Sequence, residues 1–577
     1  MGRRSLLSVL VLCWASAAWA EDCYVAPTVQ GTGTGTSAAN AKAIGTSGEG
    51  IETCLSGFTI DATNDTVHLA AGTYSVTSGI NLDISGTVTN QFIIETDGAS
   101  AATSLSDLVT TKRLTYATLV GAREFPTTEV NISTGNNMFV FGANVDYITV
   151  RRLNFKNILR GFRAALNGNN AITISDIYVD NVREFISVVG DSSCDLSTDK
   201  VYACPAGNSD TWDVDRIYGI GVSKMLIRLE GCSNSTFNDL YGTNQDRHGN
   251  IIFDDFGAMF YQDGASVGNA FTDCECHHSS QVSGTSFDNG DCFLSENTVT
   301  NTAYLRCFAF DAFDAGFDIK GTGHTITDSG AFRNGHFGIK AWHTLTVTNF
   351  ISGFSKLGTY TQYSNGYGTN HCIQPVGRIT ATRLTCINNE GAAYLFDQIG
   401  NSLLYGSGTG SAPAEATTIT GATSGATSRI SYVTVGSTGV SGTITQIFNT
   451  TGTFQVGEIV TSPSGFSATI TSLPSNLNCG EISTTNSVIA LSTGYDDVDP
   501  DNVDEGCDVG SGTWTSSGDV KWVAGVSGVD PQYPDPSNVN WNNDTNDFNS
   551  VVYTNTKGYY NVLPNDNLST KMTLGSN

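Results

Sequence analysis

Charged residues are scarce in this chain of 577 residues, at 14% of the sequence, and basic ones are the scarcer sign, with 28 Lys and Arg against 55 Asp and Glu. The net charge of −27 argues against a nucleic acid as partner, because DNA and RNA bind basic surfaces. After residue 20, no apolar run approaches the roughly 20 residues of a membrane-spanning helix, so we expect no membrane association. Segments with the 3.6-residue apolar period of a helix are nearly absent too, which excludes an all-α fold.

Short β-branched runs are what the sequence has instead, separated by Asn, Ser, Thr and 63 glycines. The segment ITVRRLNFKN at 148–157 recurs as ITISDIYVDN at 172–181, with apolar residues at matching positions and a closing Asn in both. Related units follow as far as residue 389. Short strands repeated in this way, with Asn at the turns, are typical of a parallel β-helix, whose stacked coils share one core. The sequence therefore predicts an all-β chain built as a right-handed parallel β-helix.

The first residues have the features of a cleavable secretory signal. Basic Arg3 and Arg4 precede an apolar stretch that ends in the small-residue site Ala18-Trp19-Ala20. We therefore expect a secreted protein, either extracellular or periplasmic, that acts as a monomer. The domain boundaries that we predict are 1–20 for the signal, 21–410 for a catalytic β-helix, 411–474 for an inserted β module and 475–577 for further coils and a tail.

The inserted segment 411–474 is rich in Thr, Ser and Gly, and serves either as a spacer or as a carbohydrate-binding unit. Its flanks resemble each other, since NSLL at 401–404 is similar to NSVI at 486–489, so we expect these two to be successive coils. The acidic stretch 495–508 follows. Its residues Asp497, Asp499 and Asp501 have the alternate spacing of a calcium loop, although a solvated acidic loop is the favoured interpretation.

Fourteen cysteines suit an exported protein, in which disulfides can persist. The cluster Cys274-Glu275-Cys276-His277-His278 resembles a zinc site, but alternate residues of one strand point to opposite faces, so buried or disulfide-bonded thiols are favoured. The pairs that lie close enough in sequence to form local disulfides are Cys23 with Cys54, Cys194 with Cys204, Cys372 with Cys386, and Cys479 with Cys507.

The segment 310–342 pairs with itself at a spacing of 22, so that Gly316-Phe317-Asp318 falls opposite Gly338-Ile339-Lys340. In stacked coils such residues are neighbours on adjacent strands. More acids crowd the same place. Clustered carboxylates repel one another unless a cation lies among them, and hard oxygen ligands favour calcium over zinc. The acids in question are Asp288, Asp291, Asp311, Asp314 and Asp318.

The order DNGDCF at 288–293, CFAFDAFDAGFD at 307–318 and GAFRNGHFGIK at 330–340 resembles the catalytic core of the family-nine pectate lyases. These are secreted parallel β-helix polysaccharide lyases. The resemblance implies that Asp288, Asp291, Asp314 and Asp318 bind Ca²⁺, and that Lys340 is the base that removes the proton beside a uronate carboxylate. It also implies an anionic, pectate-like polysaccharide as the substrate.

A lysine acts as a base only when its pKa falls from about 10.4 toward neutrality, which a nearby calcium ion favours and bare aspartates oppose. Lys320, two residues beyond Asp318, is the second candidate for this base. Several other side chains could bind the sugar chain. Arg333 and Arg306 could clamp a carboxylate, and Arg333 could also assist the reaction; His336 and His343 could move protons; Tyr360 and Tyr363 could stack on sugar rings.

Two other functions remain open at this point. A glycoside hydrolase on the same scaffold would use paired carboxylates, such as Asp288 and Asp314, as acid and base. A non-catalytic adhesin would use the acids to bind structural calcium, and the Thr, Ser and Gly-rich insertion suits such a surface protein. Elimination alone creates a carbon–carbon double bond, so ultraviolet absorption of the products separates the lyase from the hydrolase.

Overall fold

We describe a computed structural model of the chain. The residues that it describes are 21–59, 63–123, 135–164, 168–189, 209–252, 257–281, 289–353, 371–387, 398–415, 417–435, 440–473, 477–479, 481–485, 487–491, 513–517, 520–523, 552–553, 559–561 and 573–575. The predicted signal 1–20, the acidic loop with Asp497, Asp499 and Asp501, and the cysteines 194, 204 and 507 lie outside these residues.

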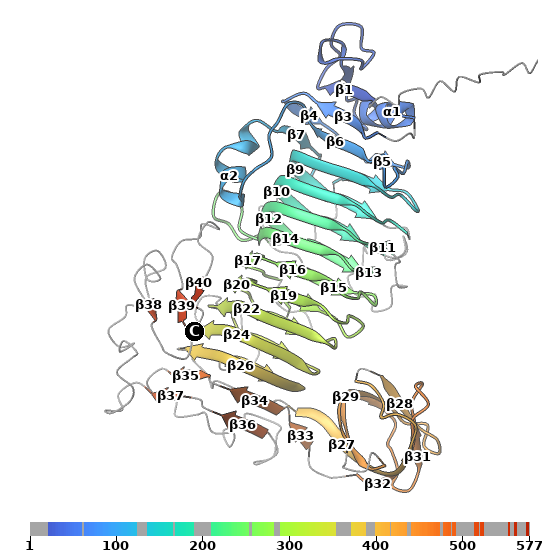
Figure 1. Cartoon of the computed structure of the whole chain (residues 1–577), viewed down its shortest axis with the longest axis vertical. Coiled ribbons are helices and arrows are strands. Elements are labelled where there is room, and N and C mark those ends of the chain that lie inside the picture. Colours follow the sequence, from blue (N-terminus) through green and yellow to red (C-terminus); the bar gives the residue numbers. More distant parts are fainter. Residues whose placement is uncertain are drawn as a thin grey trace, which may run out of the picture.

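A long stack of parallel coils forms the body of the molecule (Figure 1). The stack begins at β1 and α1, and its strands follow one another in chain order as far as β26. The N-terminal elements are β1 (Asp22–Ala26), η1 (Ala38–Asn40), β2 (Lys42–Ala43), α1 (Glu49–Gly57), β3 (Asp65–Leu69), β4 (Thr73–Ser75), β5 (Ile80–Leu82), β6 (Phe92–Thr96), α2 (Leu105–Thr110), η2 (Lys112–Leu114), β7 (Ala117–Val120) and β8 (Asn137–Phe141).

The central coils are longer and more regular. Their strands are β9 (Ile148–Ala164), β10 (Thr173–Val188), β11 (Ser209–Asp210), β12 (Asp213–Glu230), β13 (Cys232–Ser233), β14 (Thr236–Thr243), β15 (Ala258–Asp263), β16 (Ala270–Thr272), β17 (Glu275–His277), β18 (Asp291–Ser295), β19 (Ala303–Leu305), β20 (Phe308–Phe310), β21 (Ala315–Ile319), β22 (His324–Phe332), β23 (Phe337–Ala341), β24 (Leu345–Gly353), β25 (His371–Pro375) and β26 (Arg378–Ile387). Each of these pairs in parallel with a strand of the next coil, which confirms the predicted parallel β-helix.

The repeat found in the sequence is the register of the coils. β9 pairs with β10 so that Val150 lies beside Ile174 and Phe155 beside Val179, which is the predicted offset. Apolar side chains that point inward stack along the axis, as Phe260, Phe293 and Phe317 do with ring centroids 4.8 and 4.7 Å apart. Each coil therefore depends on its neighbours to bury its apolar face, which is why the repeats appear as a series.

Left-handed backbone marks the corners between strands, and its side chains form ladders. Asn157 and Asn181 have φ of 55° and 61°, and Asn181 Nδ2 donates to Asn157 Oδ1 at 2.9 Å. This is the role expected of the turn Asn, which tolerates this conformation. At another corner, an ion pair links the equivalent positions of two coils. Arg216 Nε donates to Asp176 Oδ1 at 2.7 Å, and both residues have positive φ.

An antiparallel module with its own core is inserted between two coils (Figure 1, orange). β26 pairs in parallel with β34, so the stack resumes directly after the module. The module's strands are β27 (Gln398–Thr409), β28 (Thr418–Gly421), β29 (Thr427–Val435), β30 (Gly442–Thr451), β31 (Ile459–Thr461), β32 (Ser467–Ser472) and β33 (Leu477–Cys479). The strands that follow are β34 (Glu481–Thr485), β35 (Val488–Leu491), β36 (Thr513–Ser517), β37 (Val520–Val523), β38 (Val552–Tyr553), β39 (Tyr559–Asn561) and β40 (Thr573–Gly575).

One expectation about the flanks of the insertion is wrong. Residues 401–404 do not form a coil beside 486–489, because they belong to β27, which pairs antiparallel with β30, β32 and β33. Val488 and Ile489 of the second segment belong to β35, which pairs in parallel with β26. The module's strands therefore extend beyond the residues 411–474 that composition alone suggested, because the β-rich run before residue 411 was not distinguishable from a coil.

The cysteines support an oxidising compartment. Cys23–Cys54 and Cys372–Cys386 are disulfides as predicted. Cys276 is bonded to Cys292, while Cys274 is a buried thiol, so this cluster is not a zinc site. Disulfides such as these are typical of extracellular or periplasmic proteins. Within the described residues, no helix has the length and hydrophobicity needed to cross a membrane.

Candidate functional site

The centre of the candidate site is a pair of residues on neighbouring strands of one sheet. β21 and β23 pair in parallel with Asp318 beside Lys340, as the 22-residue spacing predicts. Phe317 and Ile339 are buried in the core. Because successive residues of a strand point to opposite faces, Asp318 and Lys340 point outward together.

Asp314 occupies the turn just before β21. Its Oδ1 is bonded to Nδ1 of His336 at 2.8 Å, and this contact repeats the 22-residue spacing. Burial raises the pKa of Asp314, but the bond to His336 and the charges of Lys340 and Lys320 outweigh it, so the pKa is lowered. Its second oxygen, Oδ2, is buried and has no hydrogen-bond partner among the described residues.

Asp291 opens β18, the strand before β21. Its Oδ1 accepts a hydrogen bond from the backbone N–H of Ala315 at 3.0 Å, and Oδ2 is buried without a partner within the described part of the chain. Burial and the neighbouring charges of Asp314 and Asp318 hold the pKa of Asp291 well above its usual value. Two buried carboxylate oxygens of neighbouring coils thus lack hydrogen bonds.

Lys320 is held by two acids on the same face. Its Nζ lies 3.0 Å from Oε1 of Glu296 and 3.3 Å from Oδ2 of Asp318. Burial lowers the pKa of Lys320, yet the charges of Asp318 and Glu296 outweigh burial and raise it. A lysine that is paired twice stays protonated, so Lys320 is the weaker of the two candidates for a base.

Lys340 differs from Lys320 in its surroundings. Its Nζ lies 5.2 Å from the ring centroid of Trp342 and 5.7 Å from that of Phe337, and it forms no ion pair with a carboxylate that the structure describes. Burial lowers the pKa of Lys340, while the charges of Asp314 and Asp318 raise it, and the net direction is upward. The amine therefore lies in a field of carboxylates without being bonded to any of those described.

Trp342 and Glu296 belong to the site but were not among the predicted residues. The indole Nε1 of Trp342 donates to Asp318 Oδ1 at 2.8 Å. The ring of the same side chain lies beside the Lys340 amine. A signal for Trp342 was present in the sequence, since it lies two residues after Lys340 and so on the same face of the strand path. Glu296 also had a signal, since it precedes Lys320 by 24 residues, the offset at which β18 pairs with β21.

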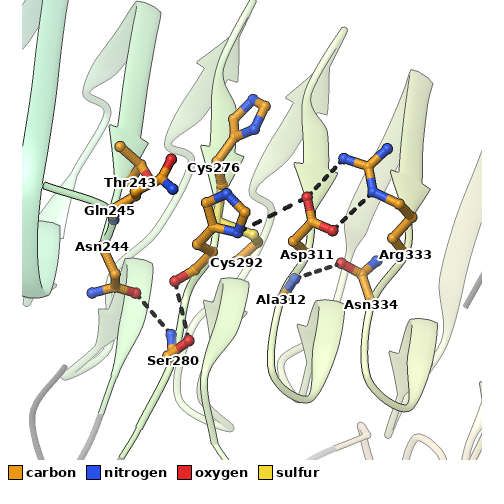
Figure 2. Close-up of polar contacts among 12 residues, drawn as sticks. Thr243, Asn244, Gln245, Cys276, Ser280, Cys292, Asp311, Ala312, Arg333 and Asn334 are labelled. Atoms are coloured by element: carbon orange, nitrogen blue, oxygen red, sulfur yellow. Dashed lines mark hydrogen bonds and ion pairs between the residues drawn. A yellow bond between two sulfur atoms is a disulfide. The ribbon is translucent and has the colours of Figure 1, made fainter. Parts of the chain in front are cut away.

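The two predicted arginine clamps are engaged in the corner ladders. Arg333 binds Asp311 through two hydrogen bonds of 2.8 and 2.7 Å, and Figure 2 shows its guanidinium group turned toward that carboxylate. Arg306 binds Asp273 in the same way, at 2.7 and 3.0 Å. Bidentate pairs of this kind already satisfy the planar guanidinium group, and they account for both arginines structurally.

The remaining predicted residues are distributed differently. His336 contacts Asp314 and belongs to the site. His343 does not reach it as expected, because its Nδ1 is bonded to the carbonyl oxygen of Ser431 in the inserted module at 2.9 Å and the residue is buried there. Burial lowers the pKa of His343 to about 4. Asp288, Tyr360 and Tyr363 lie outside the described residues.

The carboxylates of the site outnumber its cations. Four acids face two lysines, so two carboxyl groups have no matching ammonium group, and the pKa values of Asp291 and Glu296 are raised. In the described ranges, however, no three His, Cys, Asp or Glu side chains are grouped as a metal site. The acids concerned are Asp291, Glu296, Asp314 and Asp318, and the lysines are Lys320 and Lys340.

No family model and no curated protein matches the sequence. Solved structures with some similarity include a rhamnogalacturonan lyase (12% identity, 66% of this chain and 76% of that one, TM-score 0.31). They also include the pectate lyase Pel9A (14%, 60% and 78%, 0.38) and a lacto-N-biosidase from Eubacterium ramulus (11%, 58% and 64%, 0.36). Lyases and glycoside hydrolases both occur among them. At these identities and TM-scores the similarities carry no weight for activity, which has to be inferred from the site.

Proposed function

We propose that this chain is a secreted polysaccharide lyase that cleaves a uronic-acid-containing, pectate-like polysaccharide by β-elimination. The observation that carries the proposal is the Lys340 amine, which points outward beside Asp318 and forms no ion pair with the described carboxylates. A structural lysine in such an acidic place would be expected to pair as Lys320 does. The motif resemblance of residues 288–340 to the family-nine pectate lyases supports the same role.

The reaction needs a base that takes the proton from C5 of the uronate. In the proposed step, Lys340 Nζ takes that proton, the electron pair forms the C4–C5 double bond, and the C4–O bond breaks. The leaving oxygen takes a proton from water, and Lys340 then returns its proton to the solvent. Asp318 lies beside Lys340, and the rings of Trp342 and Phe337 flank the amine. The carboxylates raise the pKa of Lys340 and the rings attract its charged form, so the neutral amine that a base requires depends on the cation proposed below.

Calcium is the cofactor that we propose, and the acids of the site fit it. Asp291 Oδ2 and Asp314 Oδ2 are buried without hydrogen bonds from described residues, and oxygen ligands of this kind are those that Ca²⁺ prefers. The two carboxyl groups without a matching ammonium group would, once ionised, balance the charge of one divalent ion. Asp291 and Asp314 would hold it with these oxygens. Asp318 and Asp288 would have to complete the site on binding, since no three described acids are grouped as a metal site and Asp288 lies outside the described residues. Bound there, calcium would neutralise the carboxylate of the substrate and lower the pKa of the neighbouring amine.

The proposal is tested by following ultraviolet absorption of unsaturated products on pectate, alginate and glycosaminoglycans, with and without a chelator. The wild-type chain should produce absorbing products from at least one polyuronide, and Lys340→Ala should not, while remaining folded. Lys112→Ala, which alters a half-buried lysine whose amine donates to Ser100 Oγ, is the matched control and should keep full activity. A chain that is active after the Lys340→Ala change does not use this base.

A glycoside hydrolase is the second candidate, because Asp291 and Asp314 have pKa values shifted in opposite directions. The pKa of Asp291 is raised and that of Asp314 is lowered, and an acid–base pair needs this combination at neutral pH. A hydrolase would release reducing ends from a neutral or acidic glycan without ultraviolet absorption. It would also retain activity in the Lys340→Ala variant, so one pair of assays separates the two functions.

A further inference from the structure

The inserted module makes direct hydrogen bonds to the β-helix immediately after β23. Ser431 of β29 donates through its Oγ to the backbone oxygen of Trp342 at 3.0 Å, and its own backbone oxygen is bonded to His343 Nδ1 at 2.9 Å. Glu415 accepts hydrogen bonds from the N–H and the hydroxyl of Thr344, at 3.2 and 2.5 Å. Two residues of the module thus bind three consecutive residues of the β-helix.

A second contact reaches the other side of the candidate site. Arg429 of β29 donates through Nη2 to the backbone oxygen of Asn297 at 3.1 Å. Asn297 follows Glu296, the residue whose carboxylate binds Lys320. The charge of Glu296 also acts on the Arg429 guanidinium, whose pKa burial lowers. The module therefore touches both backbone segments that flank Asp318 and Lys340.

Strand β29 is built to present these groups. Ile430 lies in the module's apolar core, fully buried, between Arg429 and Ser431. The register of β29 against β30 shifts between Ile430 and Tyr432, and the hydrogen bonds of Arg429 and Ser431 show that both reach the β-helix. Because Ile430 anchors the strand in a core of its own, these two residues are held in place by packing that does not depend on the coils.

The residue that the module binds is the residue that organises the site. Trp342 has its main-chain oxygen bonded to Ser431, its indole N–H bonded to Asp318, and its ring 5.2 Å from the Lys340 amine. A displacement of the module would move the backbone of Trp342 and with it the indole. Misplacement of a reacting group by about 1 Å can reduce a rate by roughly 100-fold, so such a link has kinetic consequences.

We propose that the inserted module is a positioning element of the candidate site, which uses Arg429, Ser431 and Glu415 to fix Trp342 against Asp318 and Lys340. This inference rests on the proposed function for its kinetic consequence, but the positioning of Trp342 is independent of what the site does. The module would then be neither a spacer nor a separate binding unit. Trp342 is the positioning residue through which it acts.

The test uses the full-length chain with Arg429→Ala and Glu415→Ala combined, which leaves the module's core intact. The fluorescence of Trp342, obtained by subtracting the spectrum of the Trp342→Phe variant, should shift to longer wavelength as the indole loses Asp318 and meets water. On a polyuronide that the wild type cleaves, kcat should fall by roughly 10- to 100-fold while KM changes little. Arg429→Lys with Glu415 retained should restore both readouts, because lysine also donates to the Asn297 carbonyl.

Thr471→Ala, which alters an exposed hydroxyl of β32 that donates to the backbone oxygen of Leu404 in β27, is the matched control and should change neither readout. Unchanged Trp342 fluorescence in the double variant overturns the inference, whatever the activity. If the fluorescence shifts but the wild type cleaves no polyuronide, the positioning of Trp342 is supported and the proposed lyase function is contradicted. A shift with unchanged kcat in an active lyase overturns the kinetic role.

Discussion

Two charged clusters on the same face of the β-helix differ in how they are satisfied. Arg228 and Lys340 occupy the same register of one sheet, joined through Tyr261, Leu294 and Asp318. Around Arg228 the charges are paired, since the two oxygens of Glu184 bind Arg160 at 2.8 Å and Arg228 at 3.3 Å. Around Lys340 the amine has no ion pair with a described acid and two carboxylate oxygens have no hydrogen bond.

The difference separates a cluster that stabilises the fold from one that is arranged for chemistry. Buried charges persist when partners and hydrogen bonds compensate for their lost hydration. The cations around Glu184 do so, and they hold its pKa well below the usual value although the residue is completely buried. The acids beside Lys340 are compensated only in part, which costs stability and leaves groups available to a ligand. Mutations in the two clusters should therefore have opposite consequences.

The largest effect is expected at Lys340. Lys340→Ala should reduce the rate of polyuronide cleavage by about 100- to 10,000-fold, because general base catalysis contributes factors of that size. The free energy of unfolding should change by less than about 1 kcal/mol, since no described ion pair is lost. Both are measured on one preparation, by product absorption and by urea unfolding. If the free energy of unfolding falls by several kcal/mol while activity is retained, Lys340 stabilises the fold and is not the base.

The converse is expected at Glu184. Glu184→Gln should destabilise the fold by about 3–5 kcal/mol, because Arg160 and Arg228 would keep buried charges without their carboxylate. Urea unfolding measures this. Glu95→Gln is the control, since Glu95 binds the partly exposed Arg151 and Arg152 and its loss should cost about 1 kcal/mol or less. Equal effects at the two glutamates would contradict the distinction between the clusters.

Calcium should stabilise the Lys340 cluster, which has two vacant carboxylate oxygens on neighbouring coils, whereas the Arg228 cluster has one, Glu230 Oε2, in an ion pair with Arg228. At a concentration 100 times its dissociation constant, an ion that binds only the folded state adds about 2.7 kcal/mol to the free energy of unfolding. The gain is measured by urea unfolding with calcium and with a chelator. It should disappear in Asp291→Asn and Asp314→Asn and persist in Glu184→Gln. A gain that survives both aspartate changes would place the ion elsewhere.

The smallest effect concerns the contact between the module and the β-helix. Burial lowers the pKa of His343 to about 4, and the charge of Arg429 lowers it further. The pKa of the nearby His324 is also lowered to about 4. Glu415 binds Thr344, the residue after His343. A lowered pKa means that the unfolded state binds more protons between pH 6.5 and 4. The contribution of His343 is therefore complete above pH 6.5 and is lost as the pH falls, by about 2 kcal/mol at pH 5.

Unfolding of wild type and His343→Gln at pH 7 and pH 5 checks this pH dependence. The variant should lose less stability than the wild type between the two values. His248→Gln, which changes an exposed histidine, should behave like the wild type. Identical losses in the wild type and His343→Gln would show that His343 is not held neutral by the module.

Much of this arrangement could be predicted from the sequence because the fold is repetitive. The offset of 22 residues predicted that Asp318 lies beside Lys340, and the register confirms it. The same offset joins Asp314 to His336, a hydrogen bond that was not predicted. Parallel stacking converts a sequence spacing directly into a spatial neighbour, which few other folds do. The roles of these residues in binding calcium and removing a proton stay predictions.

The sequence could not reveal contacts that cross the regular spacing. Arg333 and Arg306 are not of this kind. Asp311 and Asp273 precede them by the register offsets of 22 and 33 residues, so the same spacing argument could have predicted both ion pairs. His343 and Trp342 are close in sequence to Lys340, but one is bound by the module and the other by Asp318. Nothing in the spacing of residues predicts where an antiparallel insertion with its own core will dock.

The amino-acid sequence by itself determined the β-helix, its register and the line of residues that shares a face with Lys340, because each coil must bury its apolar side chains against the next. Only the tertiary structure decided which charges are compensated and which are left open, since that depends on side chains from several coils and from the module. The contact of Ser431 with Trp342, 89 residues apart in the chain, is of this second kind.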